Sequence, residues 1–150
     1  MKLKYLKHTD ALDFFAVDKD TFASIPMFSD AVQAGFPSPA EDHMDMDLNL
    51  NDYLVENPSA TFCVKAIGES MKDAGIHSGD IMIVDKSLEP KNRSIILAVI
   101  NGEFTVKRVN INDSSLYLLP ENSSFSPIKI TQEMDFHVWG VVTYIIHKAV

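Results

Sequence analysis

Short β-rich runs separated by turn signals occupy the chain from Thr61 onward. These runs are rich in β-branched and aromatic residues and have the lengths of strands. Asn101-Gly102 lies between two of them, and this pair favours a type I′ hairpin turn, whose two central residues both have positive φ. The sequence therefore predicts a mainly β domain. The expected strands are TFCVKAI, DIMIVD, SIILAVI, EFTVKRV, LYLLP, IKIT and FHVWGVVTYIIH.

The first third of the chain has a different character. Residues 1–34 are mixed and weakly periodic, which predicts an N-terminal arm without a clear helical face. The stretch GFPSPAED then combines a glycine with two prolines and predicts an extended linker at residues 35–45. One short helix is expected near Leu48 to Val55. We therefore expect the β-rich domain to span residues 46–150.

Composition and charge limit the class of protein. The chain has 150 residues, of which 46% are hydrophobic, enough for one domain with a real core. Its net charge of −8 repels nucleic-acid phosphate, so direct sequence-specific DNA binding is not expected. Cys63 is the single cysteine, which excludes an intramolecular disulfide. No apolar run approaches the ~18 residues of a membrane span. We expect a soluble, cytoplasmic protein without a membrane partner.

One pattern resembles a metal site. DMDLNLNDYLVE places Asp45, Asp47, Asn49 and Glu56 at calcium-loop positions, but Leu50 stands where the sharp turn needs glycine. The five histidines show no ligand spacing. The sequence also lacks a Gly-rich phosphate loop. No metal or other cofactor is therefore expected.

Ser70, in the stretch VKAIGESMKDAGIHSGD, has two interpretations. Ser70 to Asp73 fit the capping pattern Ser/Thr-x-x-Asp/Glu, which predicts a helix N-cap. The alternative is a catalytic nucleophile. The G-x-S-x-G motif of hydrolases is absent, because residue 72 is lysine. His77 is the nearest histidine in sequence, and a triad assembled from distant residues stays open.

A lysine is the other group that can activate a serine. It must be neutral to accept the serine proton, so burial must lower its pKa. Lys65 and Lys107 both lie in apolar strands and both qualify. Strand alternation puts Lys107 on one face with Thr105 and Val109. The other interpretation of Lys107 is an edge-strand lysine that blocks aggregation.

Five stretches of the chain carry a resemblance to a known family. They are FSDAVQAGFPSPAED, NPSATFCVKAIGESMKDAGIHSGDIMIVD, NGEFTVKRV, LLPENSSFSPIKI and VWGVVTYII, and together they cover most of residues 26–146 in order. The chain resembles the LexA/UmuD family of self-cleaving serine peptidases. This resemblance implies a LexA/signal-peptidase-like β domain with an extended N-terminal arm.

The resemblance also implies a site, a Ser-Lys dyad for autocatalytic self-cleavage. The family's serine falls on Ser70, its lysine on Lys107, and its scissile bond on Ala34–Gly35. Free backbone N–H groups beside Ser70, including its own, can hold the oxyanion. Gly35 has no Cβ, so the chain can bend sharply there and let Ser70 approach.

A function in the SOS response to DNA damage follows from the same resemblance. In the family, RecA filaments on single-stranded DNA promote cleavage. The shortened homodimer then joins a UmuC-type Y-family DNA polymerase as a subunit for error-prone translesion synthesis. We therefore expect three partners: a second copy of the chain, the RecA–single-stranded DNA filament and a UmuC-type polymerase.

Three other functions compete with this one. A LexA-like or phage-type repressor needs a helix-turn-helix ahead of the linker. Residues 1–34 are too short for one and carry four lysines against five aspartates. A signal peptidase uses a similar dyad but needs a membrane anchor. An interaction module without catalysis is disfavoured by the presence of Ser70, Lys107 and Ala34-Gly35.

Overall fold

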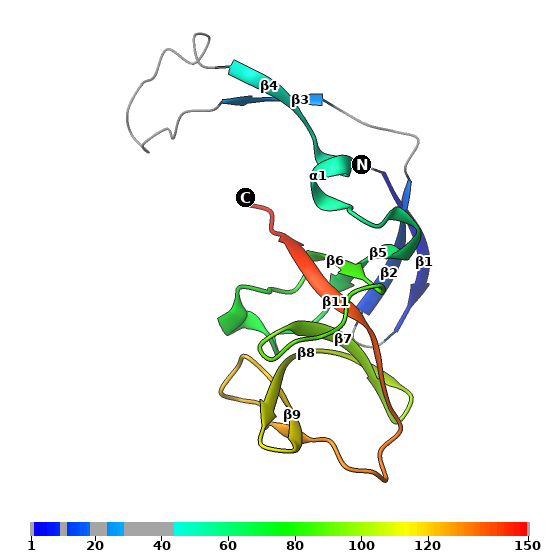
Figure 1. Ribbon diagram of the computed structural model, residues 1–150, viewed down its shortest axis with the longest axis vertical. Helices are drawn as coiled ribbons and strands as arrows, with labels where there is room; N and C mark the ends of the chain where they lie inside the picture. The colour runs from blue at the N-terminus through cyan, green and yellow to red at the C-terminus, as the bar shows by residue number, and fades with distance from the viewer. Residues whose placement is uncertain (1, 10–11, 19–23, 29–43, 150) are drawn as a thin grey trace.

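The computed structural model of the chain describes residues 2–9, 12–18, 24–28 and 44–149 (Figure 1). Within these residues the main body is one nine-stranded antiparallel sheet, in the order β1-β2-β5-β6-β11-β7-β8-β9-β10. The prediction of a mainly β fold is confirmed. The strands are β1 (Lys2–His8), β2 (Leu12–Asp18), β5 (Thr61–Ala66), β6 (Ile81–Asp85), β7 (Ile95–Ile100), β8 (Glu103–Asn112), β9 (Ser115–Leu119), β10 (Ile128–Lys129) and β11 (Phe136–Ile146).

A smaller sheet and short helices lie between β2 and β6. β3 (Ser24–Phe28) pairs with β4 (Met44–Asn49), and the two strands extend from the main body at the top of Figure 1. In α1 (Leu50–Leu54), the Asn49 side chain accepts a hydrogen bond from the Asn51 backbone N–H at 3.0 Å. The predicted short helix is therefore present, and the calcium-like pattern falls mainly on a strand and a helix. Two 3₁₀ turns follow, η2 (Pro58–Ala60) and η3 (Lys72–Ala74).

The β7–β8 hairpin forms where its sequence signal lies. Asn101 and Gly102 have φ angles of 49° and 85°, and Ile100 pairs with Glu103 across the turn. β8 is an inner strand, because β9 pairs with it from Arg108 to Asn112, and Lys107, directly before that ladder, is buried. The interpretation of Lys107 as an edge-strand lysine is therefore wrong.

Two hydrophobic clusters form the core of the described residues. Alternation along β7 divides its side chains between them, because Leu97 belongs to the first cluster and Ile96 and Ala98 to the second. All three side chains are fully buried. The first cluster also takes in Met71 and Ile76 from the segment between β5 and β6. This packing holds that segment against the sheet.

β1 and β2 extend the main sheet, although both lie within the predicted arm. β2 pairs with β5, with Leu12 opposite Ala66 and Phe14 opposite Val64, and β1 covers the other side of β2. Periodicity does not indicate these strands, because the run LDFFAVD carries apolar side chains on both faces. This part of the arm is therefore packed on the domain.

Candidate active site

Ser70 lies in the segment that links β5 to β6. Two backbone hydrogen bonds close the base of this segment, from Ala66 N–H to the Asp80 carbonyl and from Gly79 N–H to the Ala66 carbonyl, both at 2.8 Å. The 3₁₀ turn η3 has Met71 at its N-cap position and no side-chain capping hydrogen bond. The N-cap interpretation of Ser70 is therefore wrong, and its hydroxyl is not engaged by the turn.

A second loop holds the Ser70 segment in place. Asn122 is 6% exposed, and its Nδ2 donates to the Glu69 carbonyl at 2.6 Å. Asp73 N–H also donates to the Glu121 carbonyl at 2.7 Å. Because Glu69 directly precedes Ser70, these contacts fix the position of the serine. Sequence reasoning did not single out Asn122, although it lies in one of the stretches that carry the family resemblance.

Lys107 reaches Ser70 from β8. Its Nζ lies 3.3 Å from Ser70 Oγ, 2.7 Å from Thr105 Oγ1 and 3.1 Å from the Val106 carbonyl oxygen. The two predicted site residues are thus adjacent in space although 37 positions apart in sequence. Thr105 shares a strand face with Lys107, as alternation predicts, and its contact with the amine is a feature that the sequence did not indicate.

The surroundings of Lys107 favour a neutral amine. The residue is 8% exposed, and burial lowers the pKa of its amine below the ordinary 10.5. It makes no ion pair with any residue in the described ranges. A neutral amine has two N–H groups and one lone pair. If the N–H groups donate to Thr105 Oγ1 and the Val106 carbonyl oxygen, the lone pair can accept the Ser70 hydroxyl proton.

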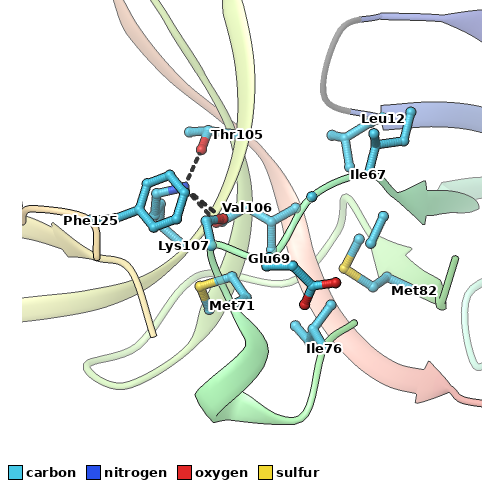
Figure 2. A pocket seen from close by; sticks show the side chains of 13 residues that line it. Leu12, Ile67, Glu69, Met71, Ile76, Met82, Thr105, Val106, Lys107 and Phe125 are labelled. Atoms are coloured by element: carbon cyan, nitrogen blue, oxygen red, sulfur yellow. Dashed lines mark hydrogen bonds between the residues drawn. The ribbon is translucent and has the colours of Figure 1, made fainter. Parts of the chain in front are cut away.

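A groove of about 260 Å³ contains the Ser70–Lys107 pair (Figure 2). Its walls are largely apolar, and Phe125 and Met71 flank the lysine in the view. A second cavity of about 560 Å³ adjoins it and shares Thr105, Lys107 and Phe125. The pair therefore lies where an extended peptide can approach it from the surface.

The other candidate bases lie elsewhere. Lys65 is exposed on β5. Each histidine in the described ranges pairs with a carboxylate, and none contacts Ser70. The pairs are His8–Asp13, His77–Glu69, His137–Asp135 and His147–Asp80. The predicted cleavage site, Ala34–Gly35, lies outside the described residues.

No group of three or more histidine, cysteine, aspartate or glutamate side chains in the described part of the chain can hold a metal ion. None of the helices there has the length and apolar character needed to cross a membrane.

A serine hydroxyl beside a buried lysine amine in an apolar groove is an arrangement of serine peptidases, and this is the class that the fold and site define. Residues 26–143 match the family described as Peptidase S24-like. The chain belongs to this family, as a UmuD-like member of the LexA/UmuD proteins, and is thus a serine peptidase of the self-cleaving UmuD type. The resemblance seen in the sequence is confirmed.

Three similar proteins each align with this chain over most of the length of both sequences. Protein SamA of Salmonella typhimurium strain LT2 is 45% identical over 126 residues, which are 84% of this chain and 87% of SamA. Protein MucA of Escherichia coli is 42% identical over 122 residues, with 81% and 83% covered. Protein ImpA of Escherichia coli is 40% identical over 129 residues, with 82% and 83% covered.

Proposed function

We propose that the protein cuts its own Ala34–Gly35 bond, with Ser70 as the nucleophile and Lys107 as the general base. The observation that carries this proposal is the 3.3 Å separation of Lys107 Nζ and Ser70 Oγ in a largely buried site. A neutral Lys107 accepts the hydroxyl proton while Ser70 Oγ attacks the Ala34 carbonyl carbon. Membership of the S24 family supports the reaction class.

The proton balance of the reaction needs no further base. The tetrahedral oxyanion collapses as the C–N bond between Ala34 and Gly35 breaks, and the Lys107 ammonium gives its proton to the leaving amine. Ala34 is then held as an ester on Ser70 Oγ. The neutral Lys107 amine then takes a proton from water, the resulting hydroxide attacks the ester carbonyl, and the Lys107 ammonium returns a proton to Ser70 Oγ as the ester bond breaks. The products are residues 1–34 and 35–150.

Backbone N–H groups beside Ser70 are suited to hold the oxyanion. Among the described residues, neither Ser70 N–H nor Met71 N–H donates a backbone hydrogen bond in this segment. Donors that are preorganised around the developing charge lower the barrier, each by roughly 3–4 kcal/mol where it has been removed in other hydrolases. We assign the Ser70 N–H as the first donor.

The dyad is tested with three matched variants. Ser70→Ala removes the nucleophile and Lys107→Ala removes the base, so both should abolish the appearance of the two fragments in an intact-mass spectrum. Lys65→Ala, which truncates the exposed lysine, should cleave at the wild-type rate. All three should keep the wild-type circular dichroism. Cleavage of the Lys107→Ala protein at the wild-type rate would show that another group is the base.

We propose that this self-cleavage is a regulated processing step in the SOS response. RecA filaments on single-stranded DNA stimulate the cut in the cytoplasm, and the shortened homodimer serves as a subunit of a UmuC-type Y-family polymerase for error-prone translesion synthesis. The similarity to SamA, ImpA and MucA supports this context. Residues 35–150 carry nine basic and sixteen acidic residues, a net charge of −7, so the product gains no electrostatic affinity for DNA.

A pull-down and a lesion-bypass assay test this role. Cleaved wild-type protein should hold the polymerase in a form that copies past DNA lesions, while uncleavable Ser70→Ala protein should support much less bypass. Intact-mass spectra of samples with and without RecA filaments report the stimulation. Tight binding of the cleaved protein to duplex DNA without any polymerase would instead favour the LexA-like or phage-type repressor.

A further inference from the structure

β5 is covered by a strand of the segment that the proposed cut separates from the domain. β2 pairs with β5 in antiparallel register over four residue pairs, from Leu12↔Ala66 to Phe15↔Cys63. β1 in turn pairs with β2 and forms the outer edge of the sheet, on the right of Figure 1. The first two strands therefore form a hairpin that is docked on the domain through a backbone ladder.

Side chains of β2 are also part of the hydrophobic core. Leu12 is 3% exposed and Phe14 is 4% exposed, and both belong to the first core cluster. The Phe14 ring lies 6.2 Å from that of Phe62, 4.8 Å from that of Phe104 and 6.3 Å from that of Trp139. Aromatic contacts of this kind add to the burial of apolar area. Docking of the hairpin thus rests on buried anchors as well as on hydrogen bonds.

The β1 strand adds a contact with the same aromatic group. Lys7 Nζ lies 5.6 Å from the centroid of the Phe14 ring and 5.1 Å from that of the Phe104 ring. Cations at this distance from an aromatic face are attracted to it. Lys7 therefore links the hairpin to β8 of the domain, in addition to the β2–β5 pairing.

Leu12 also lines the groove that contains Ser70 and Lys107. Figure 2 shows its side chain at the edge of this groove, next to Ile67. One wall of the active-site groove is therefore supplied by the arm, so the groove changes when the hairpin leaves.

The proposed cut does not break any of these contacts. Ala34 and Gly35 follow β1, β2 and β3 in the chain, so hydrolysis of their peptide bond removes a tether and leaves the β2–β5 pairing intact. We infer that the released fragment 1–34 stays docked on β5 after the cut, and that displacement of β2 is a separate, later step. This inference rests on the proposed function for the position of the cut.

A two-step switch follows. Cleavage alone leaves β5 covered and the Leu12 wall in place, while displacement of the fragment uncovers a strand edge and the apolar surface around Phe62 and Phe104. An exposed strand edge of this kind pairs readily with another strand. The occupant of β5 in the freshly cut protein is therefore residues 12–18 of the same chain.

Retention is measured by size-exclusion chromatography of the cut protein under native conditions at micromolar concentration. Denaturing mass spectrometry of the peak fractions identifies the chains in each. We expect the 1–34 fragment in the same peak as residues 35–150, at one copy per domain, whatever the oligomeric state of the domain. Elution of the fragment by itself would overturn the inference, and so would a second domain copy found on β5 in its place.

A second way of cutting separates this inference from the proposed function. Ser70→Ala protein with a recognition sequence for a site-specific protease inserted between residues 34 and 35 can be cut without self-cleavage. Loss of the fragment from this protein contradicts retention alone. Failure of the wild-type protein to cut itself contradicts the proposed function alone.

Two substitutions of the same chemistry identify the anchor. Phe14→Asp places a charge in the core. It should raise the dissociation constant of the 1–34 fragment on the order of 100-fold, as expected for loss of a buried aromatic side chain. Leu6→Asp changes a residue of β1 that is 55% exposed and should leave retention unchanged. Phe14→Ala gives the same comparison if Phe14→Asp does not fold. Equal retention by the Phe14 and Leu6 variants would contradict the assigned anchor.

Discussion

At the scale of single residues, burial favours the neutral form of Lys107. Its amine lies within hydrogen-bond distance of three oxygen atoms, Thr105 Oγ1, the Val106 carbonyl oxygen and Ser70 Oγ. Burial lowers the pKa of this amine below the ordinary 10.5. In its neutral form the amine can accept the Ser70 hydroxyl proton, as the proposed reaction requires.

The Thr105 hydroxyl positions the lysine. Thr105→Val removes the acceptor at 2.7 Å and keeps the shape of the side chain, so Lys107 Nζ loses one of the bonds that orient its lone pair. We expect a cost of about 1–2 kcal/mol, or roughly five- to thirtyfold slower cleavage. Cleavage time courses at one pH measure the effect. Thr105→Ser should stay near the wild-type rate, and equal slowing in both variants would contradict a role for the hydroxyl.

The pH dependence of cleavage follows from the lowered pKa of Lys107. The base is active when neutral, and burial shifts its deprotonation below the ordinary pKa of 10.5. The spontaneous rate should therefore rise above neutral pH, by about tenfold per unit, and level off once the lowered pKa is passed. Initial rates in a series of buffers measure this profile. A rate that falls between neutral and alkaline pH would contradict a lysine base.

Residue patterns identified the two candidate side chains but not the full site. The apolar strand pattern left Lys65 and Lys107 equivalent, and the family resemblance pointed to Lys107. In the fold, Lys107 is buried and contacts Ser70, whereas Lys65 is exposed. Asn122 and Leu12 escaped notice because their contacts with the site are tertiary. Local patterns carry no information on such contacts. The Ser70 pattern was misleading as a cap, since the turn begins one residue later.

At the scale of elements, β11 shows how closely two strands approach. A Cβ on Gly140 would lie 2.6 Å from Val84 Cγ1 and 2.9 Å from the Asp85 carbonyl oxygen. Gly140→Ala should therefore force β6 and β11 apart at a cost of about 1–3 kcal/mol. Thermal unfolding measures the shift in Tm. Val138→Ala, at an exposed position of the same strand, should change Tm much less, and equal shifts would contradict the close approach.

Asp80 joins β6 to the C-terminal segment and to the Ser70 segment. Its carboxylate accepts from His77 N–H at 2.8 Å and contacts His147 Nδ1 at 2.7 Å. Burial alone raises the pKa of Asp80, but these hydrogen bonds and the nearby histidines outweigh it and lower the pKa below the ordinary 3.8. The resulting stability is present above pH 3.8 and is lost as pH falls through the lower folded value.

Asp80→Asn tests this link. The variant should be less stable than the wild type by about 1–3 kcal/mol at neutral pH, because a buried charged acceptor is lost. The difference should shrink as pH falls from 3.8 through the lower folded pKa of Asp80, because the carboxyl becomes protonated first in the unfolded and then in the folded protein. Urea unfolding at several pH values measures it. A difference that grows on acidification would contradict the assignment.

Elements with a local signal were predictable, and elements defined by tertiary pairing were not. The β7–β8 hairpin follows from Asn101-Gly102, because the turn itself requires positive φ at both residues. β2 has apolar side chains on both faces, so no period marks it. Leu12 and Phe14 lie in the core on one face, and Phe15 on the other face contacts the Tyr5 ring. The place of β2 in the sheet depends on pairing with a strand some fifty residues away.

At the scale of the whole molecule, release of the arm after the proposed cut changes a protein surface rather than the net charge. The arm carries four of the lysines and five of the acidic residues, so its removal leaves the domain acidic. The surface that changes is the β5 edge with its aromatic group, together with the active-site groove that Leu12 lines. We therefore expect that a protein partner, rather than DNA, recognises the changed surface.

The most direct measurement is the intact-mass spectrum of purified protein incubated with and without RecA filaments on single-stranded DNA. The wild-type spectrum should show residues 1–34 and 35–150 as the two products, and filaments should speed their appearance. Ser70→Ala protein should show the intact chain alone under both conditions. A dominant cut at any other bond, or equal cleavage of the Ser70→Ala protein, would contradict self-cleavage of Ala34–Gly35 by Ser70.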